Sequence, residues 1–259
     1  MNLDAAQIQE RAPSWRVRVM DEVTSTNDVV RDLGLAGEPH GAVVFAEHQT
    51  SGRGRRQNRW LAPKGRDLMF SVLLRPEAPA HFWPRITTLA ALAICKGIEQ
   101  EIPLTPAIKW PNDVYVADRK IAGLLAESLA SPSGMFIVLG IGINVNTTEF
   151  PEDIRASATS LSLELEPEIS AMINRNSLAS VILTSLDHEL RRIDAGFVSA
   201  MEEVRPRSWL LGKTIRATAD GAEVYGRATD LNHEGHLVIA LPDGSTRALS
   251  SADDVRWVV

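Results

Sequence analysis

Arginine and glycine crowd into one short stretch of the sequence, which we call the arginine loop: Gly52-Arg53-Gly54-Arg55-Arg56-Gln57-Asn58-Arg59-Trp60. Glycine allows the backbone to turn so that N–H groups surround an anion, and guanidinium groups make paired hydrogen bonds to phosphate or carboxylate oxygens. The arginine loop therefore predicts an anion-binding site. Two alternatives stay open: a solvated basic surface loop, or a site for single-stranded nucleic acid with Trp60 as a stacking platform.

A second group of residues that could do chemistry is Lys109-Trp110-Pro111-Asn112-Asp113, followed by Lys120. Two lysines close to a carboxylate, displayed at strand ends, can hold a nucleotide phosphate together with its Mg²⁺ ion. A lysine–aspartate pair on the protein surface has the same composition, so that interpretation stays open as well.

Glycine alternates with apolar residues in a third segment, Gly140-Ile141-Gly142-Ile143-Asn144-Val145-Asn146. Glycine inside a strand weakens it unless another group must approach the backbone closely. A bound ligand is one such group, and a bulge or tight packing against a helix is the other interpretation. The sequence contains no P-loop, no nucleophile elbow and no paired-cysteine metal motif.

The elements that must position these residues are strands and helices in alternation. Compact or alternating apolar runs predict strands over residues 15–20, 41–47, 68–74, 108–110, 114–116, 121–125 and 134–146. Helical spacing predicts long helices over 82–102 and over 176–195, the latter capped by Asn176 and stopped by Gly196. The connection over 48–67 is about 20 residues long, so it is either disordered or functional.

The pattern changes beyond residue 206. Short alternating runs at 215–218, 224–229, 237–241, 246–249 and 255–258 are separated by Asp-Gly and Glu-Gly turns, which is typical of a small all-β barrel. We therefore expect a large α+β domain of antiparallel character over residues 1–206 and a small all-β domain over residues 207–259.

Composition excludes several classes of protein. The chain has 259 residues, 44% of them hydrophobic, and a net charge of −6, which weakens any case for general nucleic-acid binding. The single cysteine, Cys95, lies in an apolar run and cannot form an internal disulfide. Without a leader-like N-terminus or a long apolar stretch, the sequence predicts a cytoplasmic protein that does not span or bind a membrane.

Taken together and in order, five motifs between residues 25 and 146 resemble those of the biotin protein ligases. They are Ser25-Thr26-Asn27, Gln49 through the arginine loop, Lys109 to Asp113, Lys120-Ile121-Ala122-Gly123, and Gly140 to Asn146. In that family the catalytic domain is related to class II aminoacyl-tRNA synthetases and lipoate ligases. The resemblance implies a biotin- and ATP-binding catalytic domain with a mixed, largely antiparallel sheet, followed by an SH3-like C-terminal domain.

The resemblance also implies an activity in two steps. ATP activates biotin as biotinyl-5′-AMP, and the biotinyl group then passes to one lysine of a biotin carboxyl carrier domain of acetyl-CoA carboxylase or a related carboxylase. Biotin, ATP and Mg²⁺ are the implied substrates and cofactors. Both steps build negative charge on oxygen, which fixed cations and N–H donors stabilise.

Site residues follow from the motifs. Those implied to bind biotin are Ser25, Thr26, Asn27, Gln49, Gly52, Arg53, Lys120, Gly123, Gly140 and Gly142. Those implied to bind ATP or the adenylate are Arg53, Arg55, Arg56, Trp60, Lys120 and Asn144, with Asp113 as the magnesium contact. We expect catalysis to depend on Lys120, Arg55 and Arg53, and we expect Trp60 to form a wall for adenine.

Some differences and rivals remain at this point. Gln57 stands where the family commonly has another glycine, which predicts a stiffer arginine loop. About 20 residues precede the first motif, too few for a helix-turn-helix domain, so we expect no operator DNA binding. Two rival functions stay open. One is a lipoate or octanoate ligase, whose substrates have no ureido group to recognise, and the other is a non-catalytic binder of RNA or an effector.

Overall fold

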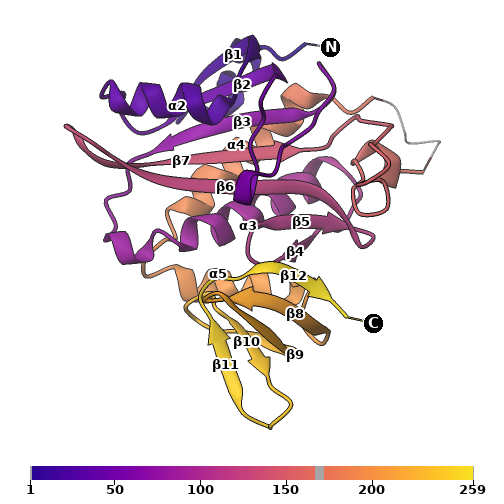
Figure 1. Cartoon of the computed structure of the whole chain (residues 1–259). Coiled ribbons are helices and arrows are strands. Elements are labelled where there is room, and N and C mark those ends of the chain that lie inside the picture. The colour runs from indigo at the N-terminus through magenta and orange to yellow at the C-terminus, as the bar shows by residue number, and fades with distance from the viewer. Residues whose placement is uncertain (1, 167–171, 259) are drawn as a thin grey trace.

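The computed structural model describes residues 2–166 and 172–258, which form two β-sheets (Figure 1). The larger sheet has the strand order β1-β2-β3-β7-β6-β5-β4. Its strands are β1 (Arg16–Val23), β2 (Ala42–Gln49), β3 (Leu68–Leu74), β4 (Ala107–Lys109), β5 (Asp113–Val116), β6 (Arg119–Ser131) and β7 (Gly134–Ile143). β1 and β2 run parallel and the other neighbouring strands are antiparallel, which confirms the expected mixed, largely antiparallel sheet.

One face of the larger sheet carries most of the apolar core. α3 (Arg85–Glu101) and α4 (Arg175–Leu190) join their buried side chains to those of β3, β6 and β7 in one cluster. The two helices are close, since a Cβ on Gly97 of α3 would lie 2.7 Å from Ile182 Cγ1 of α4. Cys95 lies buried in this core, as its apolar run in the sequence suggests, and burial raises the pKa of its thiol.

The opposite face of the larger sheet carries α2 (Thr26–Leu35). This helix packs on β2, β3 and β7 through a small second cluster consisting of Val30, Ala42, Val44, Leu73, Phe136 and Val138. Its N-terminal residues, Thr26 and Asn27, reach Ser71 near the middle of β3. The remainder of this face is therefore free to form a ligand site next to the start of α2.

The smaller sheet has the strand order β11-β10-β9-β8-β12 and lies below the larger one in Figure 1. Its strands are β8 (Thr214–Ala219), β9 (Ala222–Leu231), β10 (Leu237–Ala240), β11 (Thr246–Leu249) and β12 (Asp253–Trp257), all in antiparallel pairs. Trp209 N donates to Ile108 O of β4 at 2.9 Å, and Trp110 Nε1 donates to Gly235 O at 3.0 Å, which fixes this sheet against the larger one. The α+β class with an all-β C-terminal part is confirmed, while the boundary near residue 206 stays a prediction.

Three helical expectations were wrong or incomplete. α1 (Ala5–Arg11) was not expected, and α4 begins after Asn174 rather than Asn176 and ends at Leu190. Asn174 accepts from the backbone N–H groups of Asn176 and Ser177, whereas Asn176 accepts from Asp4 N. Gly196 precedes a further helix, α5 (Phe197–Val204), instead of ending a long one.

Short 3₁₀ helices complete the described structure: η1 (Arg55–Gln57), η2 (Ala80–Phe82), η3 (Ser162–Glu164) and η4 (Arg205–Arg207). Within the described part of the chain, no helix combines the length and the apolar character that a bilayer crossing requires.

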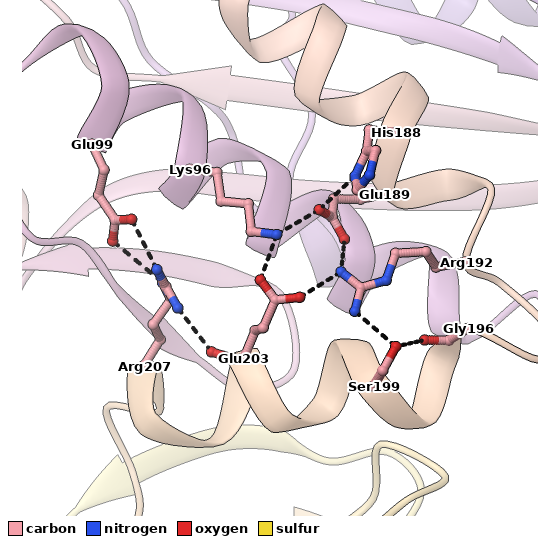
Figure 2. A network of polar contacts seen from close by, with 9 residues as sticks. All are labelled: Lys96, Glu99, His188, Glu189, Arg192, Gly196, Ser199, Glu203 and Arg207. Carbon is pink, nitrogen blue, oxygen red and sulfur yellow. Dashed lines mark hydrogen bonds and ion pairs between the residues drawn. The ribbon is translucent and has the colours of Figure 1, made fainter.

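A network of charged side chains joins α3, α4 and α5 (Figure 2). Glu189 of α4 is 1% exposed, and its carboxylate lies 2.7 Å from both Lys96 Nζ of α3 and Arg192 Nη1. Glu203 of α5 pairs with the same two cations. Because α5 leads directly into the C-terminal sheet, this network fixes the segment that joins the two sheets.

Candidate active site

Backbone forms the floor of a narrow pocket on the α2 face of the larger sheet. Gly123 of β6 pairs with Gly142 of β7, and Gly140 pairs with Ser71 of β3, so these positions open onto one face. A Cβ on Gly140 would lie 2.1 Å from Asn27 Oδ1, and one on Gly142 would lie 2.4 Å from Trp60 Cε2. The glycines therefore do allow close approach, as the alternating motif predicted.

Buried polar groups line one end of this pocket. Gln49 Oε1 accepts from Thr26 N at 2.8 Å and from Thr26 Oγ1 at 3.1 Å. Ser71 Oγ lies 2.7 Å from Thr26 Oγ1 and 2.6 Å from Asn27 Oδ1. Buried polar groups of this kind need partners, and a compact polar ligand with both donors and acceptors would match them.

The arginine loop is a folded hairpin over the same pocket. Trp60 N donates to Gly52 O at 2.9 Å, and Gly54 N donates to Asn58 O at 2.7 Å. η1 forms the tip of the hairpin, and Arg56 within it adopts a φ of 54°. The hairpin leaves Arg53, Gly54, Arg55 and Trp60 lining the pocket.

Arg53 is held by two carboxylates at the base of this hairpin. Its Nη2 lies 3.0 Å from Glu127 Oε2 and 3.2 Å from Asp28 Oδ1. Glu127 Oε2 also accepts from Asn27 Nδ2 at 2.7 Å. Glu127 therefore links the arginine loop to the polar end of the pocket, and the charge of Arg53 is balanced within the protein.

Arg55 and Arg56, at the tip of the hairpin, have their partners outside the loop, in Asn112 and in β12. Arg55 Nη1 donates to Asn112 Oδ1 at 2.9 Å, and its Nη2 donates to Asp253 Oδ1 at 2.6 Å. Arg56 pairs with Asp253 and, at 2.7 Å, with Asp254. Both aspartates belong to β12, so the C-terminal sheet contacts the tip of the arginine loop directly.

Lys120 stands where this pocket meets a second, wider one. Its Nζ lies 2.7 Å from Asp113 Oδ1 and 5.6 Å from the centre of the Trp60 ring, and its side chain is 32% exposed. Both pockets are lined by Gly54, Arg55, Trp60, Asn112 and Lys120, so they adjoin each other at these residues.

The wider pocket lies between the larger sheet and β12. Besides the shared residues it is lined by the cations Arg56, Arg59, Lys109 and Arg256, by Asn144, and by the carboxylates of Asp113, Asp153, Asp253 and Asp254, which the cations of the pocket outnumber once Arg55 and Lys120 are included. Burial lowers the pKa of Lys109, whose Nζ donates to Tyr115 Oη at 3.0 Å. Asn144 is 4% exposed, and its Nδ2 donates to Thr159 O at 2.9 Å. This pocket suits a polyanion that extends from the mouth of the narrow one.

Trp60 covers the floor of the narrow pocket. Its ring lies over Gly123 and Gly142, and its buried Nε1–H has no hydrogen-bond partner among the described residues. A buried unpaired donor costs free energy, so a ligand acceptor would be favourable here. Trp60, which we expected to form a wall for adenine, thus borders both the narrow and the wider pocket.

The described residues, 2–166 and 172–258, include no cluster of three or more His, Cys, Asp or Glu side chains that could hold a metal. Asp113, the predicted magnesium contact, is ion-paired with Lys120. The protein side chains alone therefore do not fit a resident Mg²⁺ site. A Mg²⁺ ion near Asp113 would take most of its ligands from nucleotide phosphates and water.

Comparison with known proteins identifies the family. Residues 19–144 match the biotin/lipoate A/B protein ligase family, and residues 210–253 match the biotin protein ligase C terminal domain. The biotin--[acetyl-CoA-carboxylase] ligase of Mycobacterium tuberculosis is 34% identical, over 93% of this chain and 89% of its own length. The chain belongs to the biotin protein ligases. It is therefore an enzyme that activates biotin and transfers it to a carrier protein.

Other relatives of this biotin protein ligase support the same family assignment. The bifunctional ligase/repressor BirA of Bacillus subtilis is 31% identical, over 89% of this chain and 71% of its own length. A solved biotin protein ligase from Aquifex aeolicus in complex with biotin and ATP superposes with a TM-score of 0.81 and 26% identity, over 93% of this chain and 99% of that one.

In this biotin protein ligase the fold brings most of the predicted site residues together. The narrow pocket is lined by Ser25, Thr26, Asn27, Gln49, Arg53, Arg55, Trp60, Lys120, Gly123, Gly140 and Gly142. Arg56, Asn144 and Asp113 line the wider pocket, while Gly52 lies at the base of the hairpin, where a Cβ would be 2.5 Å from Trp60 O. The roles of these residues stay predictions.

Sequence reasoning missed four residues of the ligase that the structure brings to the site. Ser71 was detectable, because it is the one polar residue in the apolar strand β3. Asn112 lies within the motif Lys109 to Asp113, but we had predicted no role for Asn112 itself. Glu127 and Asp253 gave no local signal, because their partners are 74 and 198 residues away in the chain.

Proposed function

We propose that the narrow pocket binds biotin and the wider one binds ATP, so that the biotin carboxylate meets the α-phosphorus beside Lys120. A carboxylate oxygen attacks that phosphorus, the bond to the bridging oxygen of the β-phosphate breaks, and pyrophosphate leaves. In the second step the lysine amine of the carrier attacks the acyl carbon, loses a proton and releases AMP. One observation carries this proposal. The narrow pocket has a buried polar end and a glycine floor, and it opens beside Lys120.

The polar end of the narrow pocket suits the ureido group of biotin. Thr26, Gln49, Ser71 and Asn27 offer donors and acceptors within one buried network. The Trp60 ring lies directly on Gly123 and Gly142, so it would form one wall of this pocket against the fused rings of biotin. A lipoyl or octanoyl chain has no ureido group with which this network could exchange hydrogen bonds, so it would gain less from the polar end of the pocket than biotin would.

Cations around the junction of the pockets would stabilise the reacting oxygens. Lys120 and Arg55 line both pockets and are the groups that we assign to the phosphate and the developing charge. Arg53 also lines the narrow pocket, and we assign it to the same charge as well as to anchoring the loop through Glu127 and Asp28. Asn144 and Arg56 would contact the polyphosphate from the wider pocket, which Mg²⁺ would enter bound to ATP.

The carrier protein would be the biotin carboxyl carrier domain of acetyl-CoA carboxylase or a related enzyme, since relatives carry that name. We place the reaction in the cytoplasm, because a chain with one cysteine forms no internal disulfide, which is usual for proteins of reducing compartments. No DNA or membrane partner is part of the proposal.

Biotin-dependent exchange of labelled pyrophosphate into ATP tests the first step. With Mg²⁺ present, we expect exchange with biotin and little with lipoate or octanoate. Exchange with lipoate alone would move the specificity to the rival ligase, and no exchange with any of the three acids would contradict the proposed adenylation.

Replacing Arg55 with alanine should loosen the hold on the adenylate. Arg55 links the arginine loop to Asn112 and to β12, so its loss removes both contacts at the mouth of the pocket. We expect about tenfold faster release of biotinyl-5′-AMP, because the variant lacks a group that holds the intermediate in place. The released intermediate should label more bystander lysines on an added protein. Unchanged labelling of a bystander such as serum albumin would rule out this role.

A further inference from the structure

The tip of the arginine loop is held by a strand that belongs to the other sheet. Asp253 of β12 accepts from Arg55 at 2.6 Å and also pairs with Arg56, so one carboxylate joins both guanidinium groups. Asp254 pairs with Arg56 at 2.7 Å, and Ala252 O lies 3.4 Å from Arg55 Nη2. Three consecutive residues of the C-terminal sheet therefore face two consecutive arginines.

The backbone departs from regular geometry on both sides of this contact. β12 pairs with β8 at Asp253 and again at Arg256, with a register shift between them, and Asp254 within that shift has a φ of 49°. Its partner Arg56 has a φ of 54°. Non-glycine residues rarely adopt such angles, and bulges often redirect side chains beside active sites. Strained backbone at both partners indicates that the contact serves more than sheet formation.

Stability is a poor explanation for these ion pairs. The side chains of Arg55 and Asp253 are 32% and 29% exposed, and those of Arg56 and Asp254 are 44% and 57% exposed. Ion pairs this accessible contribute little to folding. The sheets are already joined by buried contacts such as that of Trp110 Nε1 with Gly235 O.

Arg55 keeps hydrogen-bonding capacity for a ligand while it is held. A guanidinium has five N–H groups, and the contacts with Asn112, Asp253 and Ala252 use at most three of them. Arg55 still lines the narrow pocket in this position. The carboxylate therefore orients the guanidinium at the pocket mouth and need not be displaced by the ligand.

We propose that Asp253 is a positioning residue of the ligation reaction: it holds Arg55 and Arg56 where they retain the adenylate, so that the C-terminal sheet completes the active site. This inference rests on the proposed function and gives the C-terminal sheet a direct part in it.

Asp253→Asn tests the proposal, with adenylate release and bystander labelling as readouts. Biotin-dependent exchange by the unchanged enzyme is measured first, because its absence would contradict the proposed function itself rather than the role of Asp253. With exchange established, we expect Asp253→Asn to release biotinyl-5′-AMP about five- to tenfold faster and to raise the KM for ATP, while Asp253→Glu recovers part of the loss. Asp254→Asn, at the more exposed carboxylate, should shift release in the same direction by less.

A double-mutant cycle separates positioning from a general structural effect. If Asp253 acts through Arg55 and Arg56, the Arg55→Ala/Asp253→Asn double variant should release the adenylate more slowly than the product of the two single effects predicts, because only the contact with Arg56 is left to lose. Asp220→Asn is the matched control, because it breaks a surface pair with Arg247 in the same sheet at 2.9 Å. Additive losses, an equal effect in Asp220→Asn, or a lower KM for ATP in Asp253→Asn would each overturn the proposal.

Discussion

Lys120→Ala should lower biotin-dependent pyrophosphate exchange by at least about a hundredfold, as the loss of one charge-stabilising donor does in other active sites. Lys120 lines both pockets at their junction, and its charge would lie where the carboxylate oxygen joins the α-phosphorus. Alanine removes that charge and leaves the backbone of β6 unchanged. The fold should survive, because the pair with Asp113 is partly exposed, at 32% and 19%.

Lys64→Ala provides the matched control for this loss of charge. Lys64 pairs with Asp21 at 2.6 Å on the surface, with side chains 53% and 76% exposed. We expect exchange by Lys64→Ala to stay within about twofold of the unchanged enzyme, as for most surface substitutions. Exchange by Lys120→Ala within a few-fold of this control would show that Lys120 is only a surface cation, as the binder interpretation assumed.

Glu189→Gln should be the most destabilising conservative change in the network of Figure 2. The carboxylate is buried and accepts from Lys96 and His188 at Oε1 and from Arg192 at Oε2. Glutamine loses the negative charge and turns one of these oxygens into an N–H donor that faces a cation. Removing one member of a buried ionic network is expensive, so we expect a loss of roughly 2–4 kcal/mol in the free energy of unfolding. Urea denaturation at pH 7 measures it, and Glu202→Gln on the exposed side of α5 is the control.

Acid should weaken the unchanged enzyme through the same carboxylate. Burial alone would raise the pKa of Glu189, but hydrogen bonds and charges from Lys96, His188 and Arg192 outweigh it, so the pKa lies below its ordinary value. The unfolded chain then binds more protons, so this stabilisation is complete above about pH 4.3 and is lost as pH falls through the lowered pKa. Stability of Glu189→Gln should fall less steeply below that pH, and parallel curves would contradict this account.

The sequence predicted the strands better than the helix ends. Strands β2, β3 and β7 are buried over most of their length, and each contains a compact apolar run, which Ser71 alone interrupts in β3. α1 buries only Ile8 among its residues, so it offered no repeating apolar face to detect. At the start of α4 the sequence offers two asparagines as N-cap, Asn174 and Asn176. Asn176 is not the cap because its side chain contacts Asp4, which is distant in the sequence.

The candidate site was predictable where its residues lie in short motifs. Thr26, Gln49 and Lys120 could be named because they stand in recognisable segments, and the fold brings them to one pocket. The charge partners of the arginines could not be named, because an arginine-rich loop does not specify which distant carboxylates face it. Pairing Arg55 with Asp253 required the whole arrangement of the two sheets.

The floor of the narrow pocket is formed by glycine backbone, so it has no side chain that a substitution could shorten. Substitutions at Gly123, Gly140 or Gly142 can only make the pocket shallower, so evolution or engineering toward bulkier biotin analogues must change the wall that lies on this floor. Trp60 forms that wall and belongs to a hairpin held by ion pairs rather than to the sheet. Changes in substrate size should therefore accumulate in the loop.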